Sequence, residues 1–209
     1  MKFDEVTSLG YNCEVGFRIQ DYFGLMDSYP YSWAYCLDRK LFLESLDNLD
    51  DILTGDITLM PSGMFRCEKY QISFHASKEK DALFVDGKPN EEVVRLELAS
   101  LKKKIKHLVE KFYSLFQSDK KSLFVIKVKH SESDENIKFV KDLFKKIDEY
   151  YKSKNFVLLV VFEEKYISNE LLSLESDRLK IRGVKEFADD KHTDTTGDLE
   201  GWKKIFSEL

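Results

Sequence analysis

The sequence predicts a layered α/β domain with a mainly parallel sheet flanked by helices. Two apolar segments, 123–128 and 156–162, have the length of strands, and the second (FVLLVVF) contains no polar residue. A strand without polar alternation is typical of a parallel sheet with both faces covered by helices. The residues between the two segments carry one apolar stripe at helical spacing, formed by Ile137, Val140, Phe144 and Ile147. Strand, helix and strand in this order predict a βαβ unit with parallel neighbouring strands.

The N-terminal part predicts one further strand of the same sheet. Residues 4–9 read as that strand and end at Gly10, and residues 13–23 have apolar positions at helical spacing. The aromatic segment Met26–Trp33 contains a proline and is predicted to be a loop anchored by buried rings. Residues 38–49 begin with a good N-cap residue and predict a second helix.

The segment at about 50–90 is the least regular part of the sequence. Tyr70–His75 and Ala82–Val85 resemble short strands. Asp86-Gly87 is a turn signal that predicts a hairpin with the residues that follow it.

After Asn90 the periodicity predicts a helix of roughly 25 residues. Its apolar stripe consists of Leu101, Ile105, Leu108, Phe112 and Leu115. Residues 179–181 predict one more short strand, and residues 199–209 predict a closing helix. Because no linker interrupts these elements, we expect residues 1–209 to form a single domain.

Composition excludes several classes of protein. The formal net charge of −5 argues against nonspecific nucleic-acid binding, and the lysines at 102–106 are read as a solvated helix face. No apolar run approaches the roughly 18 residues of a membrane span, and the first residues lack the pattern of a secretory signal. Three widely spaced cysteines match neither a disulfide framework nor a zinc motif. We therefore expect a cytoplasmic protein without a membrane or nucleic-acid partner.

The sequence predicts no cofactor and no metal. It contains neither G-x-G-x-x-G nor G-x-x-x-x-G-K, the glycine-rich loops that cradle the phosphates of nucleotide cofactors. We therefore expect any chemistry to come from the side chains of the protein itself.

Cys13 is the residue best placed for chemistry. It lies between the first predicted strand and the first predicted helix, and ligands of open α/β sheets bind at such carboxyl ends of strands. The amides and dipole at a helix N-terminus favour the reactive thiolate. The alternative is that Cys13 is a small buried apolar residue, as most free cysteines are.

A nucleophilic cysteine usually works with a histidine. His75 and His130 each follow a strand-like segment, so either ring could emerge at the edge of a sheet. His107 lies among lysines on a predicted helix, and His192 lies in a polar segment. The residues alone therefore leave His75 and His130 open.

Two motifs resemble those of a known bacterial family. SLGYNCEVGF at 8–17 and SYPYSW at 28–33 are similar to the Ser-Leu-Gly-x-x-Cys and Ser-Tyr-Pro-Phe-Asp-Trp-like motifs of a family, formerly of unknown function, described as papain-like cysteine peptidases. The resemblance spans most of residues 4–165; the first motif is fairly specific and the later ones are loose. It implies that Cys13 is the nucleophile and His75 the base, and it makes a papain-like α+β fold the alternative to the layered one.

The sequence departs from the second motif at two positions. Ser32 stands where the family usually has Asp, and Tyr31 replaces Phe. A neutral hydroxyl cannot stabilise an imidazolium as a carboxylate can, so an orienting acid would come from elsewhere. Glu163 and Glu164, which end the strand 156–162, are the candidates.

Two functions from different classes follow. The first is a cysteine-dependent hydrolase or acyl-transfer enzyme, in which Asn12, Ser32 and Trp33 contribute to substrate binding. The second is a non-hydrolytic binding or transfer module, because members of the family are similar to proteins encoded among bacterial surface-polysaccharide genes. In that module Cys13 and Trp33 would line a pocket without covalent chemistry. In either case we expect Trp33 to be largely buried close to Cys13 as a wall of its pocket; the alternative is a core anchor with no link to a site. The expected ligand is a small molecule, a peptide or a glycan, and the first function requires Cys13 and His75 to face one cavity within hydrogen-bond reach.

Overall fold

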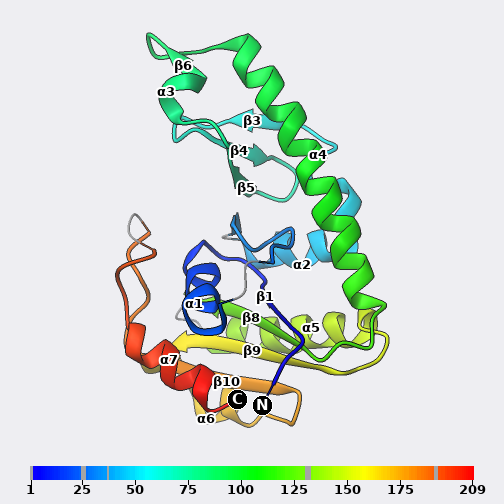
Figure 1. Ribbon diagram of the computed structural model, residues 1–209. Coiled ribbons are helices and arrows are strands. Elements are labelled where there is room, and N and C mark those ends of the chain that lie inside the picture. Colours follow the sequence, from blue (N-terminus) through cyan, green and yellow to red (C-terminus); the bar gives the residue numbers. More distant parts are fainter. Residues whose placement is uncertain (1, 25–26, 37, 130–132, 191–192) are drawn as a thin grey trace.

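The main sheet is parallel and four-stranded. The computed structural model describes residues 2–24, 27–36, 38–129, 133–190 and 193–209 (Figure 1). In the order of the sheet its strands are β1 (Glu5–Ser8), β8 (Ser122–Val128), β9 (Phe156–Glu163) and β10 (Leu179–Val184). Each pair of neighbours runs parallel. The predicted sharing of one sheet by strands near 4–9, 123–128 and 156–162 is therefore confirmed, with the last two as parallel neighbours.

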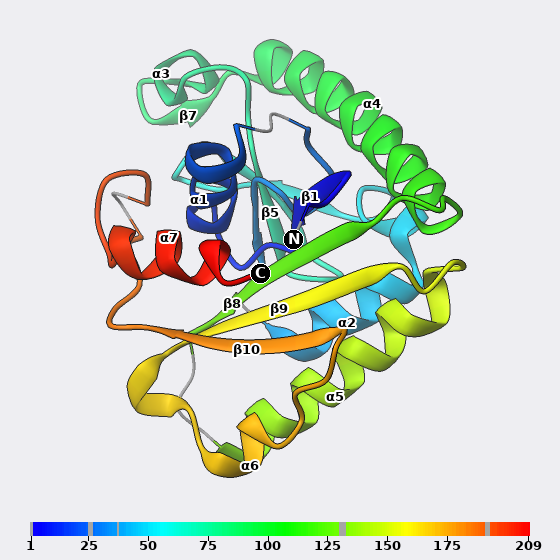
Figure 2. The same ribbon diagram turned by 60° about the horizontal axis from the view of Figure 1, so that its bottom comes forward.

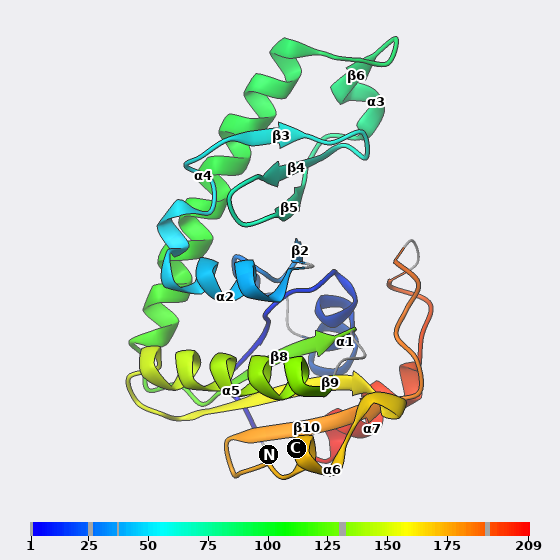
Figure 3. The ribbon, with the colours of Figure 1, turned by 180° about the vertical axis from the view of Figure 1, so that it is seen from behind.

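Helices cover both faces of this sheet (Figures 2 and 3). One side carries α1 (Glu14–Phe23) and α7 (Leu199–Ser207), and the other carries α5 (Ser133–Tyr150) with α2 (Arg39–Asp47) beside it. Alternate residues of β9 belong to two separate cores: Val157, Leu159 and Val161 to one, and Leu158, Val160 and Phe162 to the other. The strand therefore lacks polar positions because both of its faces are buried.

The segment predicted to be irregular contributes three strands to a second sheet, whose fourth strand comes from residues 34–36. In the order of the sheet its strands are β2 (Ala34–Cys36), β5 (Ile72–His75), β4 (Met64–Cys67) and β3 (Ile57–Leu59), all antiparallel. Only β5 was anticipated from the sequence. Strands of three or four residues offer too few alternating positions for a pattern to be recognised.

Short elements complete the connections. They are η1 (Leu49–Asp51), α3 (Lys80–Leu83), β6 (Phe84–Val85), β7 (Lys88–Pro89), η2 (Glu164–Tyr166) and α6 (Asn169–Leu172). The predicted hairpin is present, since Asp86 and Gly87 both have positive φ (48° and 73°) between β6 and β7. The strand predicted over 82–85 is half wrong, because its first two residues end a helical turn.

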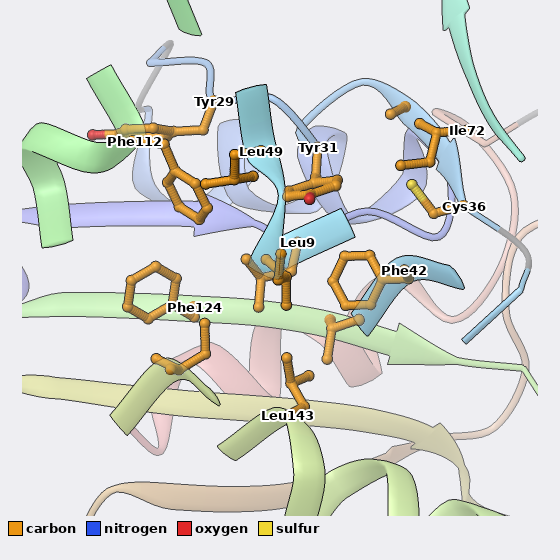
Figure 4. Close-up of a cluster of buried hydrophobic side chains, with 14 of the residues drawn as sticks. Leu9, Tyr29, Tyr31, Cys36, Phe42, Leu49, Ile72, Phe112, Phe124 and Leu143 are labelled. Atoms are coloured by element: carbon orange, nitrogen blue, oxygen red, sulfur yellow. The ribbon is translucent and has the colours of Figure 1, made fainter. Parts of the chain in front are cut away.

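The long helix α4 (Glu91–Phe116) connects the two sheets (Figure 1). Its side chains enter a core that both sheets share. Phe112 lies between β8 and the loop at 27–33 that precedes β2, which we call the aromatic loop (Figure 4). The ring centroid of Phe112 is 5.7 Å from that of Tyr29, 6.2 Å from that of Tyr31 and 6.3 Å from that of Phe124. The packing thus places the antiparallel sheet against the same interior as the parallel one.

The architecture is the predicted layered α/β fold with an added antiparallel sheet, and a papain-like α+β arrangement is not confirmed. Of the helices in the described ranges, none combines the length and the apolar character that crossing a membrane requires.

Candidate active site

A tight turn carries Cys13 from β1 to the start of α1. Gly10 and Tyr11 both adopt the left-handed region, with φ of 93° and 82°. Tyr11 is not a glycine, so this conformation is strained, and such strain concentrates at functional sites. Cys13 is the N-cap residue of α1, and the Oδ1 atom of Asn12 accepts a hydrogen bond from the Glu14 amide (3.1 Å). The turn therefore presents the thiol at a helix N-terminus.

His75 comes from the antiparallel sheet. It is the last residue of β5, and its Nε2 atom lies 3.3 Å from the Sγ atom of Cys13. The Cys36 amide of β2 donates to the Tyr11 carbonyl (3.1 Å), which ties this sheet to the turn before Cys13. The predicted approach of Cys13 and His75 to within hydrogen-bond reach is thus present.

Both residues line a cavity of about 600 Å³. One wall is aromatic and consists of Phe17, Trp33 and Tyr35. The volume lies in the ordinary range of small-molecule sites. The pair therefore faces a space large enough for a substrate.

The cavity has charged groups of both signs. Glu97 and Lys104 come from α4, and Asp190 and Asp194 come from the segment between β10 and α7. A ligand in the cavity would therefore meet one group of each sign from α4 and two carboxylates from the segment between β10 and α7.

The two central groups are neutral at rest. Burial raises the pKa of the Cys13 thiol to about 11, although the nearby Lys127 cation acts in the opposite direction. Burial and the charge of Lys104 lower the pKa of His75. Burial therefore favours the neutral thiol over the thiolate that the helix N-terminus alone would favour. With both groups neutral, Sγ–H can donate to Nε2 in the tautomer that carries the imidazole proton on Nδ1.

A buried ion pair lies beside Cys13. Lys127 of β8 and Glu14 of α1 have fully buried side chains, and the Nζ atom of Lys127 is 2.5 Å from Glu14 Oε2. The other oxygen of Glu14 accepts hydrogen bonds from the Ala188 amide and the Trp202 indole, each at 3.1 Å. Our sequence reasoning missed this pair. The signal was a single lysine inside the apolar strand LFVIKV.

Arg18 attaches the segment between β10 and α7, called the C-terminal segment below, to α1. This buried guanidinium donates to the carbonyl oxygens of Asp194 (2.9 Å), Thr193 (3.1 Å) and Thr196 (2.7 Å). In Figures 1 and 3 the segment stands beside α1. The attachment places Thr193 and Asp194 at the cavity.

Two carboxylates that line the cavity hydrogen-bond to residues near His75 and Cys13 and not to His75 itself. Glu97 accepts hydrogen bonds from the amide and the hydroxyl of Ser77, which lies two residues after His75. Asp190 accepts from the Nδ2 atom of Asn12 (3.0 Å). These acids therefore position the segments that carry His75 and Cys13.

Of the three residues predicted to bind substrate, only Trp33 lines the cavity. It is half-buried, its indole donates to Ser28 Oγ (2.9 Å), and its ring meets Phe17 edge-on at 5.1 Å. Asn12 is fully buried and caps the turn. Ser32 is also buried and accepts from the Tyr29 amide (3.0 Å). Asn12 and Ser32 do not line the cavity because they are buried and their side-chain oxygens accept hydrogen bonds from backbone amides in the turns they stabilise.

The predicted orienting acids do not reach the cavity. Glu163 pairs with Lys165 (3.0 Å), and Glu164 begins η2. Glu163 is the last residue of β9 and Glu164 follows it; β8 separates β9 from β1, and two strand spacings amount to roughly 10 Å. Across the part of the chain that the structure describes, no carboxylate hydrogen-bonds to His75.

Among the described residues, His75 is the histidine that lines this cavity. His107 lies exposed on α4, while His130 and His192 fall outside the described residues. Within the described ranges, no three His, Cys, Asp or Glu side chains gather in a way that could hold a metal ion.

Comparison with protein-family models, with curated proteins and with solved structures found no match to this chain.

Proposed function

We propose that this protein is a cysteine-dependent hydrolase or acyl-transfer enzyme with Cys13 as nucleophile and His75 as general base. The observation that carries the proposal is the 3.3 Å contact between Sγ and Nε2 at the wall of a substrate-sized cavity. Nucleophile and base within hydrogen-bond reach are the geometric signature of covalent catalysis. The resemblance of residues 8–17 and 28–33 to papain-like cysteine peptidases supports the same two residues.

The neutral pair dictates the order of proton transfer. As Sγ attacks the carbonyl carbon of an amide or ester, its proton passes to Nε2 and the carbonyl oxygen becomes an oxyanion. The imidazolium then protonates the departing amine or alcohol, which leaves a thioester on Cys13. Water or another nucleophile, deprotonated by His75, releases the acyl group and regenerates the thiol. Backbone amides in the first turn of α1 are the nearest candidates to stabilise the oxyanion.

A second candidate is the non-hydrolytic binding module. It is favoured by the raised pKa of the buried Cys13 thiol, to about 11, which keeps the thiolate scarce. In that case the aromatic wall and the charged groups would hold a ligand without a covalent step.

The two candidates differ in the acylation of Cys13. We expect p-nitrophenyl acetate to acetylate Cys13 at neutral pH and expect His75→Gln to slow this step by about 10²–10⁴-fold, the usual contribution of a general base. Peptide mapping by mass spectrometry identifies the modified thiol, and the buried Cys36 and Cys67 serve as internal controls. Equal acetylation rates in the wild type and His75→Gln would contradict catalysis by this pair and leave the binding module.

A further inference from the structure

The face of the antiparallel sheet that carries His75 continues into a second groove. In the register of this sheet His75 pairs with Met64, while Ser73 pairs with Arg66 on one side and with Tyr35 on the other. Paired residues, and residues two apart on one strand, share a face. The side chains of these five residues therefore lie on one face.

The alternate residues of the same strands point into the core. Ala34, Cys36, Phe65, Cys67, Ile72 and Phe74 are all buried there. The opposite face is therefore a floor that is not part of the hydrophobic interior. Over this floor lies a groove of about 390 Å³, lined by Met60, Met64, Arg66, Gln71 and Ser73 among others.

The groove and the cavity at Cys13 meet at one residue. Tyr35 lines both of them. A molecule that extends out of the cavity past Tyr35 would therefore lie across β5 and β4. Residues two apart on a strand are separated by about 7 Å and paired residues by about 5 Å, so Arg66 is roughly 9 Å from His75 along the sheet.

We propose that this groove is the distal half of the substrate-binding cleft, in which Arg66 binds an acidic side chain of an extended peptide whose reacting carbonyl lies at Cys13. The inference rests on the function proposed above and adds the class of its substrate.

The charges of the groove favour an acidic group. Arg66 forms a long ion pair with Glu68, with 3.9 Å between Nε and Oε2, and its buried Nε atom has no hydrogen-bond partner in the described part of the chain, while 33% of the side chain is exposed. The carboxylate of Asp38, which also lines the groove, already accepts the Leu41 amide at the start of α2 (2.9 Å). An incoming carboxylate would thus meet a guanidinium whose N–H groups are not all engaged in hydrogen bonds.

The composition of the groove favours a peptide over a glycan. Thioethers of Met60 and Met64 alternate with the polar groups of Gln71 and Ser73, which suits a chain with both apolar and polar side chains. Protein sites for sugars rely on aromatic faces, and of the described residues lining this groove Tyr35 alone is aromatic. An extended peptide also has the same residue spacing as the strands beneath it.

Disulfide exchange at Cys13 tests the groove without requiring catalysis. The probes are N-acetyl-Cys-(Gly)n-Glu amides, offered as mixed disulfides with 2-mercaptoethanol, with spacers of about one to about five glycines to cover the distance. Matched probes end in Gln. The fraction of Cys13 that carries each probe at equilibrium, in excess 2-mercaptoethanol, is measured by intact mass and peptide mapping.

We expect the Glu probe to be retained about fivefold more than the Gln probe at the best spacer length, the ratio that a partly exposed ion pair supplies. Arg66→Gln should abolish this preference and Arg66→Lys should preserve most of it. Lys88→Gln removes a positive charge from the hairpin β6–β7, outside the groove, and should leave the preference unchanged.

Three outcomes overturn the inference. They are equal retention of the Glu and Gln probes, a preference that survives Arg66→Gln, and stronger retention of a thiol-bearing oligosaccharide than of any peptide probe. Since exchange needs only the Cys13 thiol, these outcomes are distinct from unchanged acetylation in His75→Gln, which concerns the chemistry and not the groove.

Discussion

Two lysines control the charge around the Cys13–His75 pair. Lys127 is buried beside Cys13 and paired with Glu14, whereas Lys104 is exposed on the cavity wall formed by α4. Lys127 opposes the raised pKa of the thiol, and Lys104 lowers the pKa of the imidazole. Lys127 therefore makes the thiol a better proton donor, whereas Lys104 keeps the imidazole neutral and able to accept a proton but makes it a weaker base.

Lys104→Gln should raise the pKa of His75, since it removes the cation that disfavours the imidazolium. The titration of the His75 C–H resonances by NMR measures this directly. The general base we propose must be neutral to accept a proton, so activity should fall as the pH decreases through the pKa of His75, which lies below the usual 6.5. The variant should lose activity at a higher pH than the wild type. Lys103→Gln removes an exposed charge one residue away that does not line the cavity. An equal shift in both variants would mean that the effect of Lys104 is not local.

Lys127→Met should destabilise the protein by roughly 3–5 kcal/mol, because it leaves the carboxylate of Glu14 buried without its counterion. Urea unfolding followed by circular dichroism measures the loss. Glu14→Gln/Lys127→Met removes both charges and should recover a large part of it, with the amide oxygen still able to accept from Ala188 and Trp202. A double variant no more stable than Lys127→Met would show that the pair is not the main interaction of Lys127.

At the scale of elements, the cavity depends on how closely α1 approaches the aromatic loop. Gly16 allows this approach: a Cβ atom there would lie 3.0 Å from the Ser32 carbonyl oxygen and 3.1 Å from the Trp33 ring. The contact with the Ser32 carbonyl oxygen is with backbone, which cannot rotate to relieve it as a flexible side chain can. The glycine therefore serves the packing of Trp33 against the helix that begins at Cys13.

Gly16→Ala should destabilise the protein by about 1 kcal/mol. An alanine in a helix gains about 1 kcal/mol over glycine, but overpacking costs roughly 1–3 kcal/mol. The free energy of unfolding, measured by urea titration, gives the sign. Trp33→Phe offers a smaller ring, so the same substitution in that background should cost less. A stabilised Gly16→Ala variant would show that α1 and the loop separate easily.

At the scale of the whole molecule, one core joins the two sheets. Phe74 of the antiparallel sheet and Phe124 of the parallel sheet belong to the same cluster, and α4 contributes Phe112 to it. The catalytic pair we propose bridges the same two sheets, since Cys13 follows β1 and His75 ends β5. The geometry of the pair therefore depends on the integrity of this shared core.

Phe112→Ala should lower the free energy of unfolding by about 3–5 kcal/mol, because the ring is fully buried among aromatic neighbours. Unfolding should remain a single transition for the wild type and the variant, as expected if residues 1–209 form one domain. Trp33→Phe leaves Trp202, which reports on α7, and Trp202→Phe leaves Trp33, which reports on the aromatic loop. Different midpoints for the two tryptophans would contradict a single cooperative unit.

The sequence by itself determined the features that depend on local pattern. The unbroken apolar run at 156–162 indicated a strand buried on both faces, and the stripe through Phe112 indicated α4. Asp86-Gly87 indicated its hairpin turn because positive φ is costly for most other residue pairs. Cys13 was recognised as a helix-start residue from its neighbours alone.

Tertiary structure decided which distant residues meet. Cys13 and His75 are 62 positions apart, and from the residues alone His130 was an equal candidate; the resemblance to a family was needed to select His75. Glu163 and Glu164 were placed at the correct end of a strand, but the strand order puts β8 between them and the site. The protonation of Cys13 also depends on its burial in the folded chain. Periodicity reports which face of one element is buried, whereas strand order and desolvation arise from contacts between elements that the local pattern does not encode.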